Sequence, residues 1–171
     1  PVHPFNLQNE GKESYAMWQY RRGADTIAFY RQRYTLEEMF QGKRVLDIGC
    51  GAGGKTMYYA AQGVEHICGM DIVAGYRQQA EELAQQLGYA DRFTFVAGDA
   101  ADTGFAENSF DTVIMNDAME HVAQPELVLD EVRRILRAGG RRQAFKPISG
   151  PTRQKARPSA GVSVTKTVQT P

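Results

Sequence analysis

The segment Lys43–Thr56, KRVLDIGCGAGGKT, decides the fold that we expect for this chain. A short apolar run ends at Ile48, and the positions from Gly49 to Gly53 hold only glycine, alanine and cysteine before helix-compatible residues resume. This pattern predicts a strand, a tight turn and a helix. Glycines leave the backbone of such a turn open to a ligand, and the following helix N-terminus offers N–H groups to a polar or anionic group. The segment therefore predicts a nucleotide-type binding pocket.

The same turn matches three known fingerprints. Gly49, Gly51 and Gly53 give the GxGxG pattern of enzymes that bind S-adenosylmethionine. Gly49, Gly51 and Gly54 give the dinucleotide pattern GxGxxG, and the stretch from Gly49 to Thr56 gives the phosphate-binding P-loop pattern GxxxxGK[ST]. The turn alone does not choose between them, so the choice depends on the remaining sequence.

The composition is that of an ordinary single domain. The 171 residues are 42% hydrophobic and 23% charged, which is enough apolar material for a core. We find no run of about 18 apolar residues and no basic-then-apolar leader pattern, and we expect a soluble, cytoplasmic protein without a membrane partner. Cys50 and Cys68 lack CxxC spacing, which indicates reduced structural thiols. His3 and His66 have no ligand cluster at metal-binding spacing, so we expect no metal.

The formal charge of zero conceals an asymmetry. Residues 1–131 carry 10 basic and 20 acidic side chains, a net charge of −10, whereas residues 132–171 carry 10 basic and no acidic side chains, a net charge of +10. A basic tail can bind nucleic acid or another anionic surface. A nucleic-acid-binding module is therefore one alternative function, and a tail that does not fold is the other interpretation.

The N-terminal segment, residues 1–42, is predicted to be helical and rich in aromatic side chains. Asp25 could cap a helix that runs to about Tyr34, and a second short helix fits Leu36–Phe40. We expect most of the aromatic side chains to pack against the central sheet, with one or two left to close over a ligand.

From residue 43 onward, strand and helix patterns alternate. Apolar runs that end in glycine or acidic residues predict four strands, at residues 45–48, 65–71, 93–96 and 110–115. Helical spacing predicts one helix at residues 72–87 and a second that begins at Pro125 and is ended by Gly139 and Gly140. Strands that are each followed by a helix or a crossover form a parallel, doubly wound sheet. The sequence therefore predicts a three-layer α/β/α fold.

Three aspartates lie at or next to the ends of predicted strands, on the side where parallel sheets bind ligands. Asp71 follows Gly53 by 18 residues, a spacing at which a strand-end carboxylate accepts hydrogen bonds from a ribose diol. Asp99 could accept from an exocyclic amine such as that of adenine, or it could only cap the following loop. Asp47 precedes the first glycine by two residues, where a carboxylate suits a cationic group and repels a triphosphate. These charges favour S-adenosylmethionine over a P-loop nucleotide.

Together these features resemble one known family. The chain resembles class I S-adenosylmethionine-dependent methyltransferases of the small-molecule type in the order and spacing of five motifs: VLDIGCGAG (45–53), MD (70–71), GDA (98–100), NSFDTVIMNDAMEHV (108–122) and LDEVRRILRAGGR (129–141). The resemblance covers residues 43–141. It implies a Rossmann-like fold and an S-adenosylmethionine-binding core at residues 43–140.

The resemblance also implies which residues contact the cofactor. The turn would surround the methionine end with Asp47, Gly49, Cys50, Gly51 and Gly53. Asp71 would hold the ribose hydroxyls, with Ile72 against the adenine. Asp99 and Ala100 would recognise the adenine edge. Asn116, at the end of the fourth strand, would line the methyl-transfer side.

The implied reaction is transfer of a methyl group to a small-molecule acceptor by in-line displacement, for which the protein mainly supplies alignment. His121 is the candidate general base because it follows the fourth strand and histidine titrates near neutrality, although a local hydrogen-bonding role fits it equally well. NDAMEH stands where enzymes that methylate nucleic-acid bases have an NPPY-type motif, so nucleic acid is not the expected acceptor. If the chain is an enzyme of another kind, the alternative is a P-loop nucleotide-binding enzyme that uses Gly49 to Thr56.

The family pattern stops after Gly140. Arg141, Arg142 and Lys146 interrupt the expected fifth strand, and Pro147, Pro151 and Pro158 would break any regular element after it. We therefore expect a truncated or altered member of the family that lacks the usual last strands, with a basic, poorly ordered tail at residues 141–171. Without a fifth strand the fourth would form an exposed edge, through which the chain could self-associate.

Overall fold

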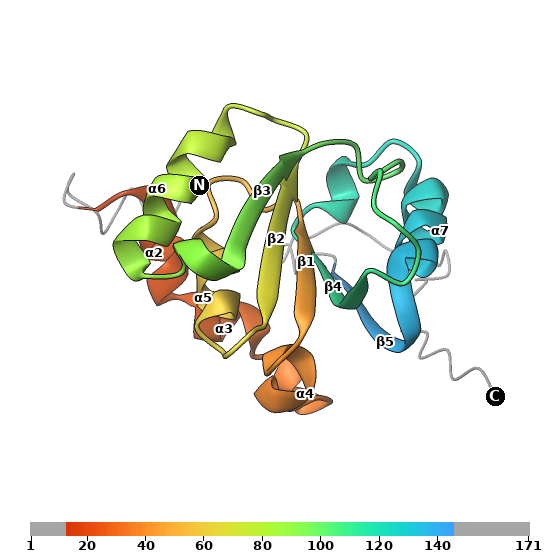
Figure 1. The fold of residues 1–171 in the computed structure, drawn as a ribbon, viewed down its shortest axis with the longest axis horizontal. Helices are drawn as coiled ribbons and strands as arrows, with labels where there is room; N and C mark the ends of the chain where they lie inside the picture. Colours follow the sequence, from red (N-terminus) through yellow and green to blue (C-terminus); the bar gives the residue numbers. More distant parts are fainter. Residues whose placement is uncertain (1–12, 146–171) are drawn as a thin grey trace, which may run out of the picture.

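The structure, a computed structural model, describes residues 13–145 around a central parallel sheet (Figure 1). Its strands are β1 (Arg44–Ile48), β2 (His66–Asp71), β3 (Phe93–Ala97), β4 (Phe110–Asn116) and β5 (Leu136–Phe145). The helices are α2 (Tyr15–Arg21), α3 (Gly23–Ile27), α4 (Leu36–Phe40), α5 (Gly54–Ala60), α6 (Tyr76–Leu87) and α7 (Pro125–Ile135). Short 3₁₀ turns are η1 (Tyr30–Gln32), η2 (Ala90–Arg92) and η3 (Met119–His121). The predicted fold class, a three-layer, mainly parallel α/β/α sheet, is confirmed.

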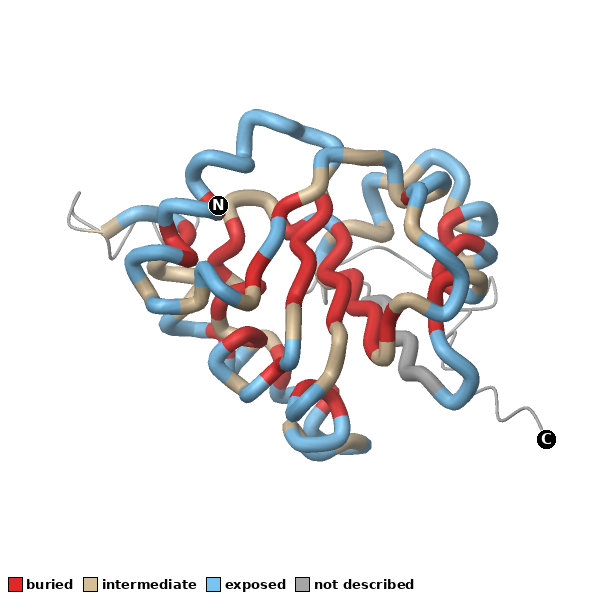
Figure 2. Tube along the Cα trace, viewed as in Figure 1, coloured by how far each residue is buried: buried red, intermediate tan, exposed pale blue. Residues whose placement is uncertain are grey.

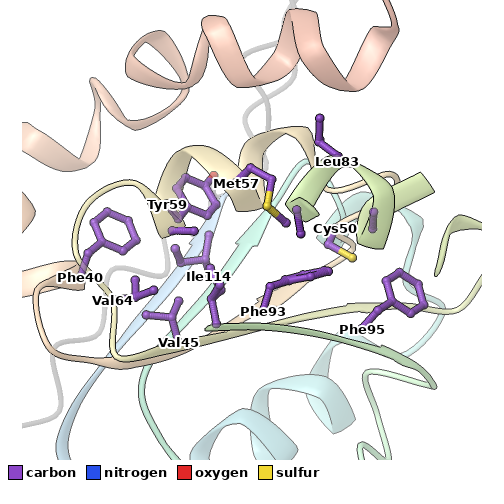
Figure 3. Close-up of a cluster of buried hydrophobic side chains, with 14 of the residues drawn as sticks. Phe40, Val45, Cys50, Met57, Tyr59, Val64, Leu83, Phe93, Phe95 and Ile114 are labelled. Carbon is purple, nitrogen blue, oxygen red and sulfur yellow. The ribbon is translucent and has the colours of Figure 1, made fainter. Parts of the chain in front are cut away.

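Helices cover both faces of the sheet, because successive strand residues point to opposite sides. Val45 and Ile114 belong to the apolar cluster beneath α5 and α6, whereas Leu46 and Val113 belong to the cluster beneath α7. Figure 3 shows the first cluster, and buried residues follow the central strands in Figure 2. Figure 1 places α2, α3, α5 and α6 to one side of the strands and α7 to the other. The resulting two cores fix the sheet between the helical layers.

The second predicted N-terminal helix is confirmed as α4. Thr35 Oγ1 accepts from the Glu38 N–H at 3.1 Å, and the Glu38 carboxylate accepts from the Thr35 N–H at 2.8 Å. This reciprocal capping box satisfies N–H groups that the helix start leaves unpaired.

The first predicted N-terminal helix is wrong. Asp25 lies inside α3, which ends at Ile27, instead of capping a helix to Tyr34. α3 starts at Gly23, before Asp25, where it packs closely on α5: a Cβ at Gly23 would lie 2.0 Å from Cγ of Tyr58. Close contact of this kind depends on which helix lies nearby, and local spacing does not reveal it.

The sheet is one strand wider than predicted, because β5 pairs in parallel with β4 as far as Phe145. Arg141 and Arg142 therefore do not interrupt the fifth strand, since ladder hydrogen bonds come from the main chain. The expectation that glycines end the preceding helix is also wrong, because α7 ends at Ile135 and Gly139 lies within β5 at φ +79°. β4 is an interior strand, so the exposed β4 edge from which we expected self-association is not present.

The rest of the predicted tail, residues 146–171, lies outside the described residues. Within residues 13–145, no helix is long and apolar enough to cross a membrane.

The strand order β3-β2-β1-β4-β5 positions the site. The chain builds outward from β1 to β3 and then returns to add β4 and β5 on the other side of β1. In sheets of this kind, the loops that follow the two strands at the switch point diverge and leave a crevice for a ligand. The loops after β1 and β4 are therefore where a ligand is expected.

Candidate functional site

Two cavities lie at this switch point, and both are lined by Gly49 after β1 and by Asp117 after β4. The first, of about 430 Å³, is bordered by the ends of β2 and β3 and by η3, and we call it the β2 cavity. The second, of about 540 Å³, is bordered by the glycine turn, α2 and α6, and we call it the α2 cavity. A ligand long enough to occupy both would pass over Gly49.

The structure brings the predicted cofactor residues together, with one exception. The β2 cavity is lined by Gly49, Asp71, Ile72, Asp99 and Ala100. The α2 cavity is lined by Asp47, Gly49, Cys50, Gly51 and Asn116. Gly53 is not among the residues that line either cavity. It caps α5 at φ +82°, and a Cβ there would lie 3.2 Å from Cβ of Ala80, so its role is close packing of α5 against α6.

The glycine turn uses its own N–H groups to hold its shape. The N–H groups of Gly49 and Cys50 donate to the Met70 carbonyl at 2.7 and 3.1 Å. The Gly51 N–H donates to Asp71 Oδ2 at 2.8 Å. A P-loop instead turns such N–H groups toward phosphate oxygens.

Two further features of the turn count against the P-loop interpretation. The Thr56 hydroxyl, which a P-loop uses on a metal ion, donates to Asp47 Oδ2 at 2.6 Å. Lys55, which a P-loop uses on phosphates, forms an ion pair with Asp117. Both groups therefore lie beside a carboxylate, Asp47 or Asp117, that would repel a nucleotide phosphate, and the P-loop alternative is not supported.

Asp71 links the glycine turn to the loop after β2. Its second carboxylate oxygen, Oδ1, accepts from the Val73 N–H at 3.0 Å, while Oδ2 accepts from Gly51. A carboxylate oxygen has two acceptor sites, so each oxygen retains one after these bonds. Because Asp71 also lines the β2 cavity, it is able to accept hydrogen bonds from a hydroxylated ligand there.

Asp99 has the loop-capping role that its sequence position allowed, and its recognition of an adenine amine stays a prediction. Its Oδ1 accepts from the Ala101 N–H at 2.8 Å, and its carbonyl accepts from the Asp102 N–H at 3.2 Å, so it does stabilise the local turn. It also lines the β2 cavity. The turn therefore fixes Asp99 at the cavity wall.

The two cavities are rich in acidic side chains. Among the described residues that line them, the carboxylates are Asp47, Asp71, Glu82, Asp99 and Asp117, and the one lysine or arginine is Lys55. Asp47 is only 3% exposed, and burial raises its pKa from 3.8 to about 6, against the lowering effects of the Thr56 hydrogen bond and of Lys55. This charge distribution suits a ligand that is cationic at one end.

Replacing Asp47 with asparagine should change how stability depends on pH. The pKa of Asp47 is higher in the folded state than in the unfolded chain. Between about pH 4 and pH 6, the folded state therefore keeps a proton that the unfolded chain has released. The free energy of unfolding consequently falls as the pH rises across that window. Asp47→Asn should therefore match the wild type at pH 4 and exceed it at pH 7, by up to about 3 kcal/mol. Denaturant titrations at both pH values measure this.

The control is Asp111→Asn, for which the sign is opposite. Burial by itself would raise the pKa of Asp111, but the Arg44 N–H and the Arg137 guanidinium lower it below its usual value. Loss of the Asp111 carboxylate should destabilise the protein at pH 7 and have little effect at low pH, where the carboxyl group is protonated. The prediction would be contradicted if the difference in unfolding free energy between Asp47→Asn and the wild type were the same at pH 4 and pH 7. Burial of the Asp47 charge would then not destabilise the protein.

Sequence reasoning missed the ion pair between Lys55 and Asp117. Asp117 adopts φ +56°, a left-handed conformation that aspartate and asparagine tolerate better than most residues, and it also accepts from Asn116 Nδ2 at 3.1 Å. An Asn-Asp pair directly after a buried strand could have signalled such a turn. Its pairing with Lys55, 62 residues earlier, depends on the parallel pairing of β1 and β4.

His121 lies in η3 and lines the β2 cavity. Its side chain is 78% exposed, and Nε2 lies 3.6 Å from Glu120 Oε1. The ring is therefore at the rim of the cavity, and its role as a base stays a prediction. Within the described part of the chain there is no group of three or more His, Cys, Asp or Glu side chains that could hold a metal ion.

Comparison with known proteins agrees with this geometry. The protein family described as Methyltransferase domain matches residues 46–142, more than half of the chain. A sterol 24-C-methyltransferase of Gibberella zeae is 36% identical over 99 residues, which are 58% of this chain and 26% of that protein. A demethylmenaquinone methyltransferase of Symbiobacterium thermophilum is 36% identical over 113 residues, which are 63% of this chain and 45% of that protein.

A solved structure from Pyrococcus horikoshii is also similar, at 28% sequence identity and a TM-score of 0.61, over 82% of this chain and 61% of that one. The chain spans less than half the length of the two curated relatives. The match to the family begins within β1 and ends within β5, and it includes the carboxyl ends of β1 to β4, which border the two cavities. The chain therefore belongs to the methyltransferase domain family, the class I methyltransferases that use S-adenosylmethionine as their cofactor.

Proposed function

We propose that this chain binds S-adenosylmethionine across the β2 and α2 cavities and transfers its methyl group to a small-molecule acceptor. The observation that carries the proposal is the pair of acid-lined cavities that meet at Gly49, at the switch point of the sheet. When bound, the cofactor supplies a methyl group that its sulfonium already activates. The chain's own residues bind, orient and enclose the reactants.

The β2 cavity suits the adenosine end. Asp71 retains acceptor capacity on both carboxylate oxygens for the ribose hydroxyls. Ile72 lines the cavity with a side chain that is otherwise 75% exposed, so an adenine ring lying on it would remove apolar surface from water. Asp99 has one oxygen in the local turn and the other for an exocyclic amine.

The α2 cavity suits the methionine end, which carries an ammonium and a carboxylate. Lys55 is the one lysine or arginine among the described lining residues and is the partner we propose for the carboxylate. Asp117, now paired with Lys55, would take the ammonium. An exchange of partners of this kind replaces one ion pair with two, so no charge is left buried without a counter-charge.

Alignment is the main contribution that the protein makes to methyl transfer, because the reaction is an in-line displacement. Asn116 and Asp117 close the end of β4 where the two cavities meet, so they would set the direction from which an acceptor approaches. A base is needed only for an acceptor that arrives protonated, and His121 at the rim is placed for that task. The relatives named for sterol and demethylmenaquinone substrates favour a small-molecule acceptor here.

Calorimetric titration tests the proposal directly. The chain should bind S-adenosylmethionine and S-adenosylhomocysteine at one site per chain, because the acidic cavities complement a cationic or zwitterionic adenosine derivative. Mg-ATP and NAD, titrated separately, should give no binding, because the acidic side chains that line the cavities would repel their phosphates. Binding of ATP with no binding of S-adenosylhomocysteine by a folded sample would refute the proposal.

A further inference from the structure

One wall of the β2 cavity is a loop with little structure of its own. Residues 98–109 connect β3 to β4, and Gly98, Asp99, Ala100 and Ala101 line the cavity. The main-chain ladder within this loop is a single isolated bridge between Asp99 and Asp102. This turn fixes Asp99 relative to Asp102, and the Gly98 N–H donates to the Asp71 carbonyl at 3.0 Å, whereas the middle of the loop is held by contacts with α7.

The anchor is Glu131 on α7. Its side chain is buried at 9% exposure, and its Oε1 accepts from the Thr103 N–H at 3.0 Å and from the Thr103 hydroxyl at 2.5 Å. Thr103 is itself 8% exposed, and its hydroxyl oxygen accepts from the Phe105 N–H at 3.3 Å. The middle of the loop is thus fastened to the helix through one carboxylate oxygen.

Arg134, one turn further along α7, completes the anchor. Its Nε donates to Glu131 Oε2 and its Nη2 to Glu131 Oε1, both at 2.7 Å, in the two-point geometry that makes such pairs strong. The same Nη2 donates to the Phe105 carbonyl at 2.7 Å. The Arg134 hydrogen bonds, together with those from Thr103 and against the effect of burial, lower the pKa of Glu131 to about 2. The carboxylate therefore stays charged at neutral pH.

Position along the loop connects this anchor to the ligand. Ala101 is the last residue of the loop that lines the cavity, and its N–H donates to Asp99. Thr103 lies only two residues further along the chain. The N–H groups of Ala101 and Asp102 both donate to Asp99, so the turn moves as a unit, and a shift of Thr103 away from α7 would displace Asp99. We infer that Glu131 is a positioning residue for adenine recognition, because it fixes the loop that presents Asp99 and Ala100 to the β2 cavity. The inference rests on the proposed function, in which the adenosine end of the cofactor occupies that cavity.

The test is Glu131→Gln, which keeps the side-chain volume. The glutamine oxygen is still able to accept from Thr103, but its NH₂ group faces the Arg134 guanidinium, so the two-point pair is lost. Three ligands separate the possible effects: S-adenosylhomocysteine; S-inosylhomocysteine, in which an oxo group replaces the adenine amine; and 5′-methylthioadenosine, which lacks the amino-acid end.

The variant should weaken S-adenosylhomocysteine binding about tenfold, the effect of one lost hydrogen bond to a charged group. Its preference for S-adenosylhomocysteine over S-inosylhomocysteine should fall by a similar factor. Its preference for S-adenosylhomocysteine over 5′-methylthioadenosine should stay the same, because the α2 cavity does not contact the loop. A purely structural role would lower the melting temperature without changing the adenine preference, and that result would overturn the inference.

Asp130→Asn is the matched control, since Asp130 pairs with Arg133 on the same helix, but both side chains are at least half exposed and neither bonds to the loop. It should leave both preferences unchanged. If Glu131→Gln does not fold, Thr103→Val removes the two hydroxyl bonds, to Glu131 and from the Phe105 N–H, and keeps the bond from the Thr103 N–H to Glu131. It should reduce the adenine preference to a smaller extent, and an unchanged preference there overturns the inference. Failure of the unaltered chain to bind S-adenosylhomocysteine would instead refute the proposed function, and this inference with it.

Discussion

Gly49→Ala should abolish S-adenosylhomocysteine binding and destabilise the fold. Gly49 adopts φ +78°, and a Cβ there would lie 2.4 Å from Cβ of Ala118, far inside the contact distance of about 3.5 to 4.0 Å between carbon atoms. The left-handed conformation costs an alanine about 1–2 kcal/mol, and overpacking adds about 1–3 kcal/mol. The total is a large part of the roughly 5–15 kcal/mol by which domains are stable. Denaturant midpoints and calorimetric titration measure both losses.

Two variants separate the backbone cost from the clash. Gly88→Ala places alanine at φ +77°, at the end of α6, where nothing lies within 4 Å of the added Cβ. It should lose only the backbone contribution and should keep its ligand affinity. Adding Ala118→Gly to Gly49→Ala removes the clashing methyl group and should restore stability to the level of Gly88→Ala. A double variant no more stable than Gly49→Ala would show that Ala118 is not the cause.

Asp71→Ala should weaken S-adenosylhomocysteine binding by about 100-fold or more. Two hydrogen bonds from the ribose hydroxyls to a charged carboxylate contribute about 1.5–3 kcal/mol each, and every 1.4 kcal/mol is a factor of ten. The variant also leaves the N–H groups of Gly51 and Val73 without the acceptor that ties the glycine turn to β2. Calorimetric titration at constant pH and salt gives the affinity.

A modified ligand shows whether the effect passes through the ribose. In the unaltered chain, 2′-deoxy-S-adenosylhomocysteine should bind more weakly than S-adenosylhomocysteine, and in Asp71→Ala this difference should disappear. Asp91→Ala removes an exposed aspartate that lines neither cavity and should change nothing. If Asp71→Ala kept the full difference between the two ligands, Asp71 would act through the turn and not on the ribose.

Much of the core was predictable because buried parallel strands appear in the sequence as short apolar runs. β1 to β4 and the start of α7 at Pro125 lie close to their predicted positions. Glycine and aspartate at the strand ends also marked the cavity edge, since parallel strands place their carboxyl ends together. The helix predicted at residues 72–87 begins only at Tyr76, because residues 72–75 form the loop that Asp71 holds.

The sequence did not reveal features that depend on main-chain pairing or on exact packing. β5 forms although Arg141 and Arg142 lie within it, because its ladder with β4 uses backbone groups. Gly54 matched the dinucleotide fingerprint, yet a Cβ there would lie 2.2 Å from the Ala16 carbonyl oxygen, so it is needed for contact with α2. A glycine pattern alone does not distinguish room for a ligand from room for a neighbouring helix.

The sequence by itself determined the parallel α/β core and the set of small and acidic residues at its ligand edge, because strand periodicity and strand-end chemistry are local properties. Only the tertiary structure decided which of these residues meet. Lys55 reaches Asp117 across 62 residues, and Glu131 reaches Thr103 across 28. Such contacts depend on how the chain returns to the sheet, since a side chain meets a distant partner only after the strands have set both in place.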